Sequence, residues 1–216
     1  MPTQARAHET RAAIITAAAS LFRTRGYGGT SQDDVAQAAG VTKGALYFHF
    51  TSKEHIALAV VGAQHDAGLT LIDDISIDRI TGVAAVLEIT YRFARLLRTD
   101  PITQAGIRLT IESSNFSSPI VETYYDWIRF AESHLQAAAA AGEIRDTIDI
   151  TAAARFIIPA FTGVQRVSDT LTGRTDLYQR VDEMWALIVP TLVTPERVDE
   201  FLQMSARLRR DMELQS

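Results

Sequence analysis

Apolar residues recur at spacings of three and four through nearly the whole chain of 216 residues. This spacing gathers them on one face of an α-helix. No stretch shows the sustained alternation of apolar and polar residues between hairpin turns that a half-buried strand requires. The pattern therefore predicts an all-α protein.

The first 50 residues predict three helices joined by tight turns. The first covers residues 8–25 and stops at Gly26, and the second starts at Thr30 or Ser31 and stops at Gly40. Glycine is common just past a helix end, and a hydroxyl residue is common at a helix start. Thr42 is placed to cap a third helix over residues 43–49. Two short helices joined by a tight turn are the geometry of a helix-turn-helix.

The rest of the chain predicts a helical bundle, with helices over residues 51–71, 78–99, 101–113, 119–141, 151–172, 176–193 and 195–213. Thr51 and Glu54 match the capping-box pattern. Three further starts place a capping residue before a proline: Asp100–Pro101, Ser118–Pro119 and Thr194–Pro195. The pattern thus predicts a small helix-turn-helix domain over residues 1–51 and a larger helical domain over residues 52–216.

Charge is divided unevenly between these regions. Residues 1–50 hold five cations and three anions, a net charge of +2, whereas the whole chain carries −5, so the remainder carries −7. Phosphate binding favours a basic surface. Only the first segment is suited to DNA, and an acidic remainder would help to orient the docking face.

Composition and motifs argue against an enzyme. The chain has no cysteine, which fits a reducing compartment. The turn after Gly26 lacks the third glycine of a dinucleotide fingerprint, because position 31 is serine. The five histidines lack metal-ligand spacing. We expect no catalytic residue, metal or cofactor. The polar N-terminus and the absence of a run of ~18 apolar residues predict a cytoplasmic protein without a membrane partner.

The segment Gly40–Phe50, together with Ser52–Glu54, closely resembles the recognition segment of TetR-type regulators. The preceding Phe22–Tyr27 and Thr30–Ala36 also fit that family. The resemblance implies a DNA-binding regulator whose third helix enters the major groove. It also implies a DNA-binding domain over residues 1–51 and a ligand-binding and dimerisation domain over residues 52–216. We expect the DNA-contacting residues to be Thr30, Ser31, Thr42, Lys43, Gly44, Ala45, Tyr47, His49 and Lys53.

Residue type suggests what these positions do. Gly44 and Ala45 allow close approach to the groove, and Lys43 can reach a base edge or a phosphate. Hydroxyl and imidazole groups can donate to phosphates, which positions the protein without specifying sequence. We expect Leu46, Phe48 and Phe50 to pack in the core.

Three later segments resemble γ-butyrolactone receptors, a TetR-type subgroup: Ala105–Leu109, Tyr124–Trp127 and Phe161–Gln165. The resemblance implies a repressor released by a γ-butyrolactone, butenolide or related furan signal that controls antibiotic or secondary-metabolite genes. It also implies that Trp127 lines the ligand cavity. We expect Leu87, Tyr91 and Ile111 beside it, and Gln64, Thr162 and Gln165 to bind ligand oxygens.

The resemblance further implies a homodimer, formed by the helices at 151–172 and 176–193, on a pseudo-palindromic double-stranded operator. Trp185 anchors either the dimer or the monomer core. Release requires that the ligand bind more tightly to a conformation in which the two recognition helices have the wrong separation for DNA than to the DNA-competent conformation. We expect helix 51–71 to act as the lever between the two domains. Alternatives are a TetR-type repressor of an efflux or metabolic gene answering another lipophilic ligand, and a pseudo-receptor that answers antibiotics or no lactone.

Overall fold

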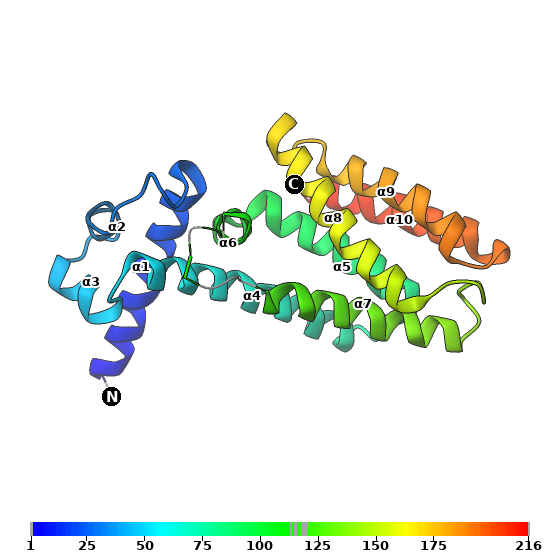
Figure 1. Cartoon of the computed structure of the whole chain (residues 1–216), viewed down its shortest axis with the longest axis horizontal. Coiled ribbons are helices and arrows are strands. Elements are labelled where there is room, and N and C mark those ends of the chain that lie inside the picture. The colour runs from blue at the N-terminus through cyan, green and yellow to red at the C-terminus, as the bar shows by residue number, and fades with distance from the viewer. Residues whose placement is uncertain (1, 113, 115, 118–120, 216) are drawn as a thin grey trace. The chain divides into compact units, whose positions relative to one another are not determined.

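The computed structural model describes residues 2–112, 114, 116–117 and 121–215. All regular elements in these residues are helical, which confirms the all-α prediction (Figure 1). One isolated antiparallel bridge joins Ile144 to Val193. No helix in this described part of the chain is long and apolar enough to cross a membrane.

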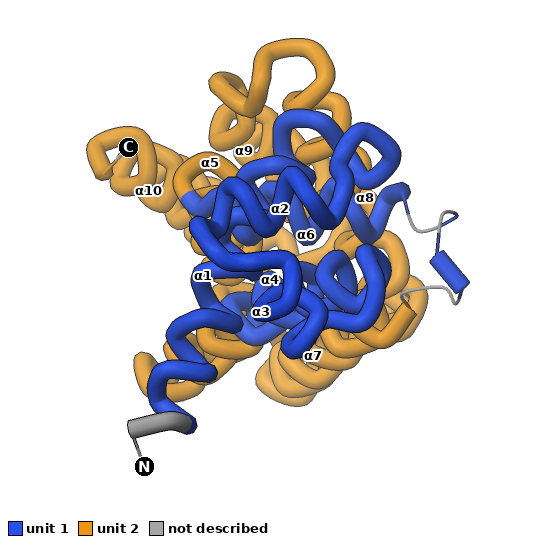
Figure 2. The backbone as a smooth tube through the Cα atoms, turned by 90° about the vertical axis from the view of Figure 1, so that its left-hand side faces the viewer, with its two compact units in different colours: residues 1–68, 100–120 blue, residues 69–99, 121–216 orange. Residues whose placement is uncertain are grey.

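The chain forms two compact units, Met1–Gly68 with Asp100–Ile120, and Leu69–Thr99 with Val121–Ser216 (Figure 2). These units differ from the expected division at residue 51. The boundary between them falls inside α4, Lys53–Ile77, and a segment 32 residues further along the chain returns to unit 1. The functional division at residue 51 stays a prediction.

Unit 1 contains α1 (Pro2–Arg25), α2 (Gln32–Ala38), α3 (Lys43–His49), the first part of α4, and α6 (Pro101–Ile111). One apolar core joins all five helices: it includes Ile14, Phe22, Val35, Leu46, Ile56, Ala105 and Leu109. Helix α6 is therefore part of the same folded body as the helix-turn-helix.

Local chemistry sets the helix-turn-helix boundaries. Gly26 and Gly40 have φ of 72° and 66° and follow α1 and α2, where a side chain would strain the left-handed backbone. Ser31 caps α2 in a capping box with Asp34. Thr42 caps α3 by accepting a hydrogen bond from the Ala45 N–H at 3.2 Å. Ser31, Thr42 and both glycines act here as predicted.

Unit 2 contains α5 (Gly82–Thr99), α7 (Glu122–Ala140), α8 (Ile150–Thr172), α9 (Leu177–Leu192), the 3₁₀ turn η2 (Pro195–Arg197) and α10 (Val198–Leu214), with the end of α4. Helix α7 packs on α5 and α8, while α9 packs on α8 and α10. This arrangement forms the predicted helical bundle.

Some predicted boundaries need correction. The capping box at Thr51 and Glu54 is wrong: Ser52 caps α4 by accepting from the His55 N–H, and Glu54 instead accepts from the N–H and hydroxyl of Ser117. Asp100 caps α6 as predicted. Pro195 starts a 3₁₀ turn that precedes α10, rather than the α-helix itself. The predicted helix start at Ser118–Pro119 lies outside the described residues.

Candidate DNA-binding surface and ligand-binding residues

Helix α3 presents one face to the core and another to solvent. Leu46 and Phe50 are buried, as predicted. Phe48 is not: 81% of its surface is exposed, so the prediction that it packs in the core is wrong. Gly44 is exposed, and Tyr47 is 50% exposed. The outer face of α3 therefore carries a bare backbone at residue 44 beside two aromatic rings.

Lys43 starts this helix with its ammonium group held by α2. Its Nζ donates to Oδ2 of Asp33 at 2.6 Å, and both side chains remain mostly exposed. The hydrogen bond to Asp33 and its negative charge raise the pKa of Lys43. The cation thus lies on the surface, paired with a carboxylate that would compete with a DNA phosphate for it.

The other predicted DNA contacts are placed unequally. Thr42 and Ser31 are exposed, whereas Ala45 and His49 are half-buried. Thr30 is 2% exposed, and its hydroxyl donates to the Gly26 carbonyl at 2.9 Å. We therefore leave Thr30 out of the DNA-contacting set, because its side chain holds the turn instead.

Lys53 supports the turn after α1. Its Nζ donates to the Tyr27 carbonyl at 2.9 Å and lies 4.2 Å from the centre of the Tyr27 ring. The Phe116 ring meets the same ring edge-on at 5.0 Å. A phosphate contact from Lys53 would use its remaining N–H groups.

Helix α6 holds the same turn through an ion pair that the sequence analysis missed. Arg108 Nε donates to Glu112 at 2.8 Å, and Arg108 Nη1 donates to the Arg23 carbonyl at 2.9 Å. The second Glu112 oxygen accepts from the Tyr27 N–H at 3.1 Å. The spacing of arginine and glutamate by four residues was the available signal. The α1–α2 turn is thereby fixed to a helix about 80 residues away in sequence.

Two predicted ligand residues belong to unit 1. Gln64 on α4 is fully buried, its Nε2 has no hydrogen-bond partner, and Gly106 of α6 packs against its side chain. Ile111 is 38% exposed at the end of α6, so it is a partly solvated residue within this unit. An unpaired buried amide is costly, which makes Gln64 the stronger candidate.

Unit 2 places Trp127, Thr162 and Gln165 on α7 and α8. Trp127 is half-buried, and its ring meets Phe93 edge-to-face at 5.1 Å. Gln165 is buried, and its Oε1 lacks a partner. The Thr162 hydroxyl already donates to the Ile158 carbonyl. Trp127 thus joins an aromatic cluster, and Gln165 supplies an unused acceptor.

Leu87 and Tyr91 lie fully inside unit 2. The Tyr91 hydroxyl lies 2.8 Å from the Ser205 hydroxyl and 3.4 Å from an Asp182 oxygen. Burial raises the pKa of Tyr91 well above its ordinary value. Its polar end therefore joins α5 to α9 and α10, a structural role that the sequence pattern did not reveal.

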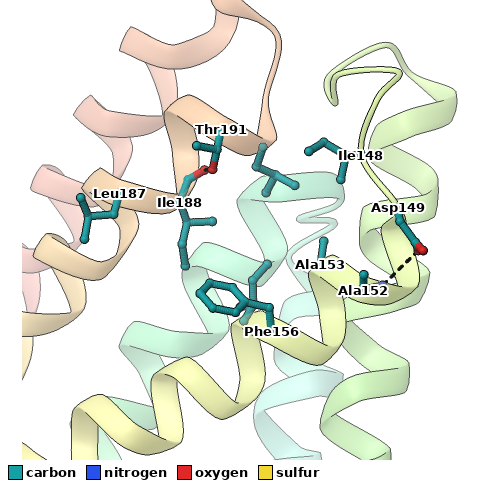
Figure 3. A pocket seen from close by; sticks show the side chains of 10 residues that line it. Ile148, Asp149, Ala152, Ala153, Phe156, Leu187, Ile188 and Thr191 are labelled. Carbon is teal, nitrogen blue, oxygen red and sulfur yellow. Dashed lines mark hydrogen bonds between the residues drawn. The ribbon is translucent and has the colours of Figure 1, made fainter.

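The burial of Trp185 decides between its two expected roles, an anchor of the dimer or of the monomer core. It is fully buried, and its indole N–H donates to Thr90 at 2.9 Å, so it anchors the monomer core. The outer surfaces of α8 and α9 instead form an apolar groove of about 420 Å³ (Figure 3). Phe156 and Leu187 line it and are largely exposed.

The described residues contain no group of three or more histidine, cysteine, aspartate or glutamate side chains that could hold a metal ion. The arrangement in unit 1, a capped helix with an exposed polar and aromatic face after a tight turn, is the geometry of the helix-turn-helix that many DNA-binding regulators use.

Comparison with protein families agrees with this class. The family described as bacterial regulatory proteins of the tetR family matches residues 14–60, and the one described as tetracyclin repressor-like, C-terminal domain, matches residues 80–194. The chain belongs to the TetR family. It is a DNA-binding repressor of that type rather than an enzyme, which confirms the expectation from the sequence.

Individual relatives place it near γ-butyrolactone receptors. The A-factor receptor protein of Streptomyces griseus is 36% identical over 90% of this chain and 68% of its own length. A solved γ-butyrolactone receptor, described as ArpA-like, is 30% identical with a TM-score of 0.79 over 95% of this chain and 98% of its own. CprB from Streptomyces coelicolor, solved with its operator sequence, is 32% identical with a TM-score of 0.82 over 94% and 98%.

Proposed function

We propose that this chain represses genes of antibiotic or secondary metabolism by binding a pseudo-palindromic operator as a homodimer, and that a γ-butyrolactone, butenolide or related furan releases it. The observation that supports DNA reading best is the outer face of α3. Gly44 has no atom closer than 4.0 Å to the Cβ that it lacks, so a duplex can approach its backbone. Lys43 and Tyr47 flank that opening.

Affinity selection from a random duplex library, followed by fluorescence anisotropy, tests this role. Gly44→Leu should abolish binding to the selected duplex without loss of stability, because the new side chain points into open space in the free protein. Gly62→Leu is the matched control, since Gly62 is also exposed with nothing within 4 Å. Equal affinity of both variants would refute the proposed use of α3.

The ligand proposal rests on unit 2. Trp127 offers a flat apolar wall beside Phe93, which in turn contacts Phe161 at 6.2 Å. The unpaired oxygen of Gln165 is a hydrogen-bond acceptor for a ligand hydroxyl, whereas Gln64, which belongs to unit 1, stays a separate proposed contact. Small-molecule sites combine such apolar walls with a few polar groups. Because α4 runs through both units, we propose it as the lever between ligand binding and DNA release.

Titration of the protein–duplex complex with a synthetic γ-butyrolactone, a butenolide, a furan carboxylic acid and a lipophilic cation distinguishes the ligand classes. Release by one of the first three supports the proposal, and release by the cation alone favours an efflux-type regulator. Trp127→Ala should bind the duplex but resist release. Tyr125→Ala, an exposed aromatic on the same helix, should respond like the parent.

We propose that the groove on α8 and α9 lies in the dimer interface. Exposed apolar patches mark association surfaces. A dimer is also required for the proposed function, because two recognition helices must reach successive major grooves about 34–36 Å apart. Leu187→Arg should shift the sedimentation coefficient to that of a monomer. Leu214→Arg, at a leucine of α10 that is also largely exposed, should remain dimeric. A dimeric Leu187→Arg protein would place the interface elsewhere.

A further inference from the structure

Phe48 has no structural role in the free protein that explains its position. It is 81% exposed, more than its neighbour Tyr47, although it lies on a helix whose inner face is well packed. Among the residues that the structure describes, the ring beside it is that of His49, whose centre is 5.1 Å away at an interplanar angle of 83°. A phenyl ring forms no hydrogen bond with water, so burying this ring against an apolar group of a partner would be favourable.

The position of Phe48 on α3 says where that partner lies. Residues four apart share a helix face, and helical side chains lean toward the N-terminus. The Phe48 ring therefore leans toward Gly44, which has no side chain to cover the helix there. The same face carries the opening through which we propose that DNA approaches.

We infer that Phe48 reads thymine in the operator by packing against its C5-methyl group, an inference that rests on the proposed DNA-binding function. The edges of base pairs in the major groove are mostly hydrogen-bond donors and acceptors, which a phenyl ring cannot use. The thymine methyl is the apolar group presented there. Phe48 thus adds sequence preference to a face whose hydroxyls and cation chiefly contact phosphates.

Replacing single thymines of the selected duplex with deoxyuridine tests the inference, because this change removes one methyl and keeps every hydrogen-bonding group. At one or two thymine positions of each half-site, the single replacement should weaken binding of the parent protein about fourfold. This factor corresponds to about 0.8 kcal/mol for one buried carbon group. Phe48→Ala should bind the unmodified duplex more weakly and show no further loss with deoxyuridine. Tyr125→Ala should keep the sensitivity of the parent.

The outcomes separate this inference from the proposed function. If the parent protein binds no selected duplex, the DNA-binding function itself fails. A second case is that the parent protein binds and Gly44→Leu does not. Only the reading of thymine by Phe48 is then refuted if no deoxyuridine replacement weakens binding, or if Phe48→Ala loses as much affinity with deoxyuridine as the parent does. Half-sites selected without thymine would refute it equally. The thermal midpoint of Phe48→Ala should match that of the parent, because the ring is exposed.

Discussion

Replacing Gly106 with alanine should destabilise unit 1, although alanine is the better helix former. The Cβ that alanine adds would lie 2.5 Å from Gln64 Cβ and 2.9 Å from Gln64 Cγ. Ordinary contacts lie at 3.4–4 Å, so α4 and α6 must separate by roughly 1 Å, or one helix must shift. The obstacle is the stem of Gln64 rather than its flexible end, which leaves little room for relief by rotation.

Two opposing effects set the magnitude. Overpacking of a filled core costs about 1–3 kcal/mol, and exchanging glycine for alanine inside a helix returns about 1 kcal/mol. Gly62→Ala on α4 gains the second effect alone, because nothing lies within 4 Å of its added Cβ. The difference between the two variants therefore isolates the overlap at Gln64. It should amount to about 1–3 kcal/mol, or roughly 2–12 °C in the thermal midpoint for a chain of this size.

Urea and thermal unfolding followed by circular dichroism measure this difference. Gly62→Ala should unfold at or above the parent midpoint, and Gly106→Ala below it. If the two variants unfold together, the close approach of α4 and α6 does not exist in solution. Because α6 also carries Arg108, Gly106→Ala should weaken duplex binding as well, whereas Gly62→Ala should not.

Three further variants test the surface and the turns. Lys43→Ala should weaken binding to every duplex and lower the salt dependence of the binding constant by about one unit of slope. Asp33→Asn removes the competing carboxylate and should tighten binding, so the same change in affinity for both variants would contradict the pairing of Lys43 with Asp33. Glu112→Ala should speed hydrogen exchange at the Tyr27 amide, measured by mass spectrometry, and unchanged exchange would argue against that hydrogen bond. Hydrogen bonds from Ser168 and other donors lower the pKa of Asp176 to about 2. Its stabilising effect is therefore complete above about pH 4 and lost as the pH falls through 2, so the stability advantage of the parent over Asp176→Asn should shrink across that range, and a constant advantage would refute the assignment.

Local chemistry made the helix-turn-helix predictable. Gly26, Gly40, Ser31 and Thr42 act within a few residues of themselves, through φ or a single capping bond, so the sequence contains the whole cause. The family resemblance indicated which of these helices to expect in the major groove. The same reasoning correctly assigned Leu46 to the core.

Distant partners limited the rest. The pattern at Glu54 satisfied the capping rule, but Ser117, more than 60 residues away, binds that carboxylate. Phe48 was assigned to the core from its residue type, and only the tertiary packing shows that its side of α3 is uncovered. The sequence also did not reveal that the Tyr91 hydroxyl lies beside Ser205 and Asp182, because these residues are distant along the chain; its place beside the ligand stays a prediction.

The composition of unit 1 bears on how regulators of this kind are recombined. A chimera that joined residues 1–68 to a foreign sensor would lack Ala105 and Leu109, both fully buried in the core shared with Phe22 and Ile56. It would also leave the α1–α2 turn without Arg108. A transplant that keeps the parent's operator preference therefore needs a second crossover that brings residues 100–120 along.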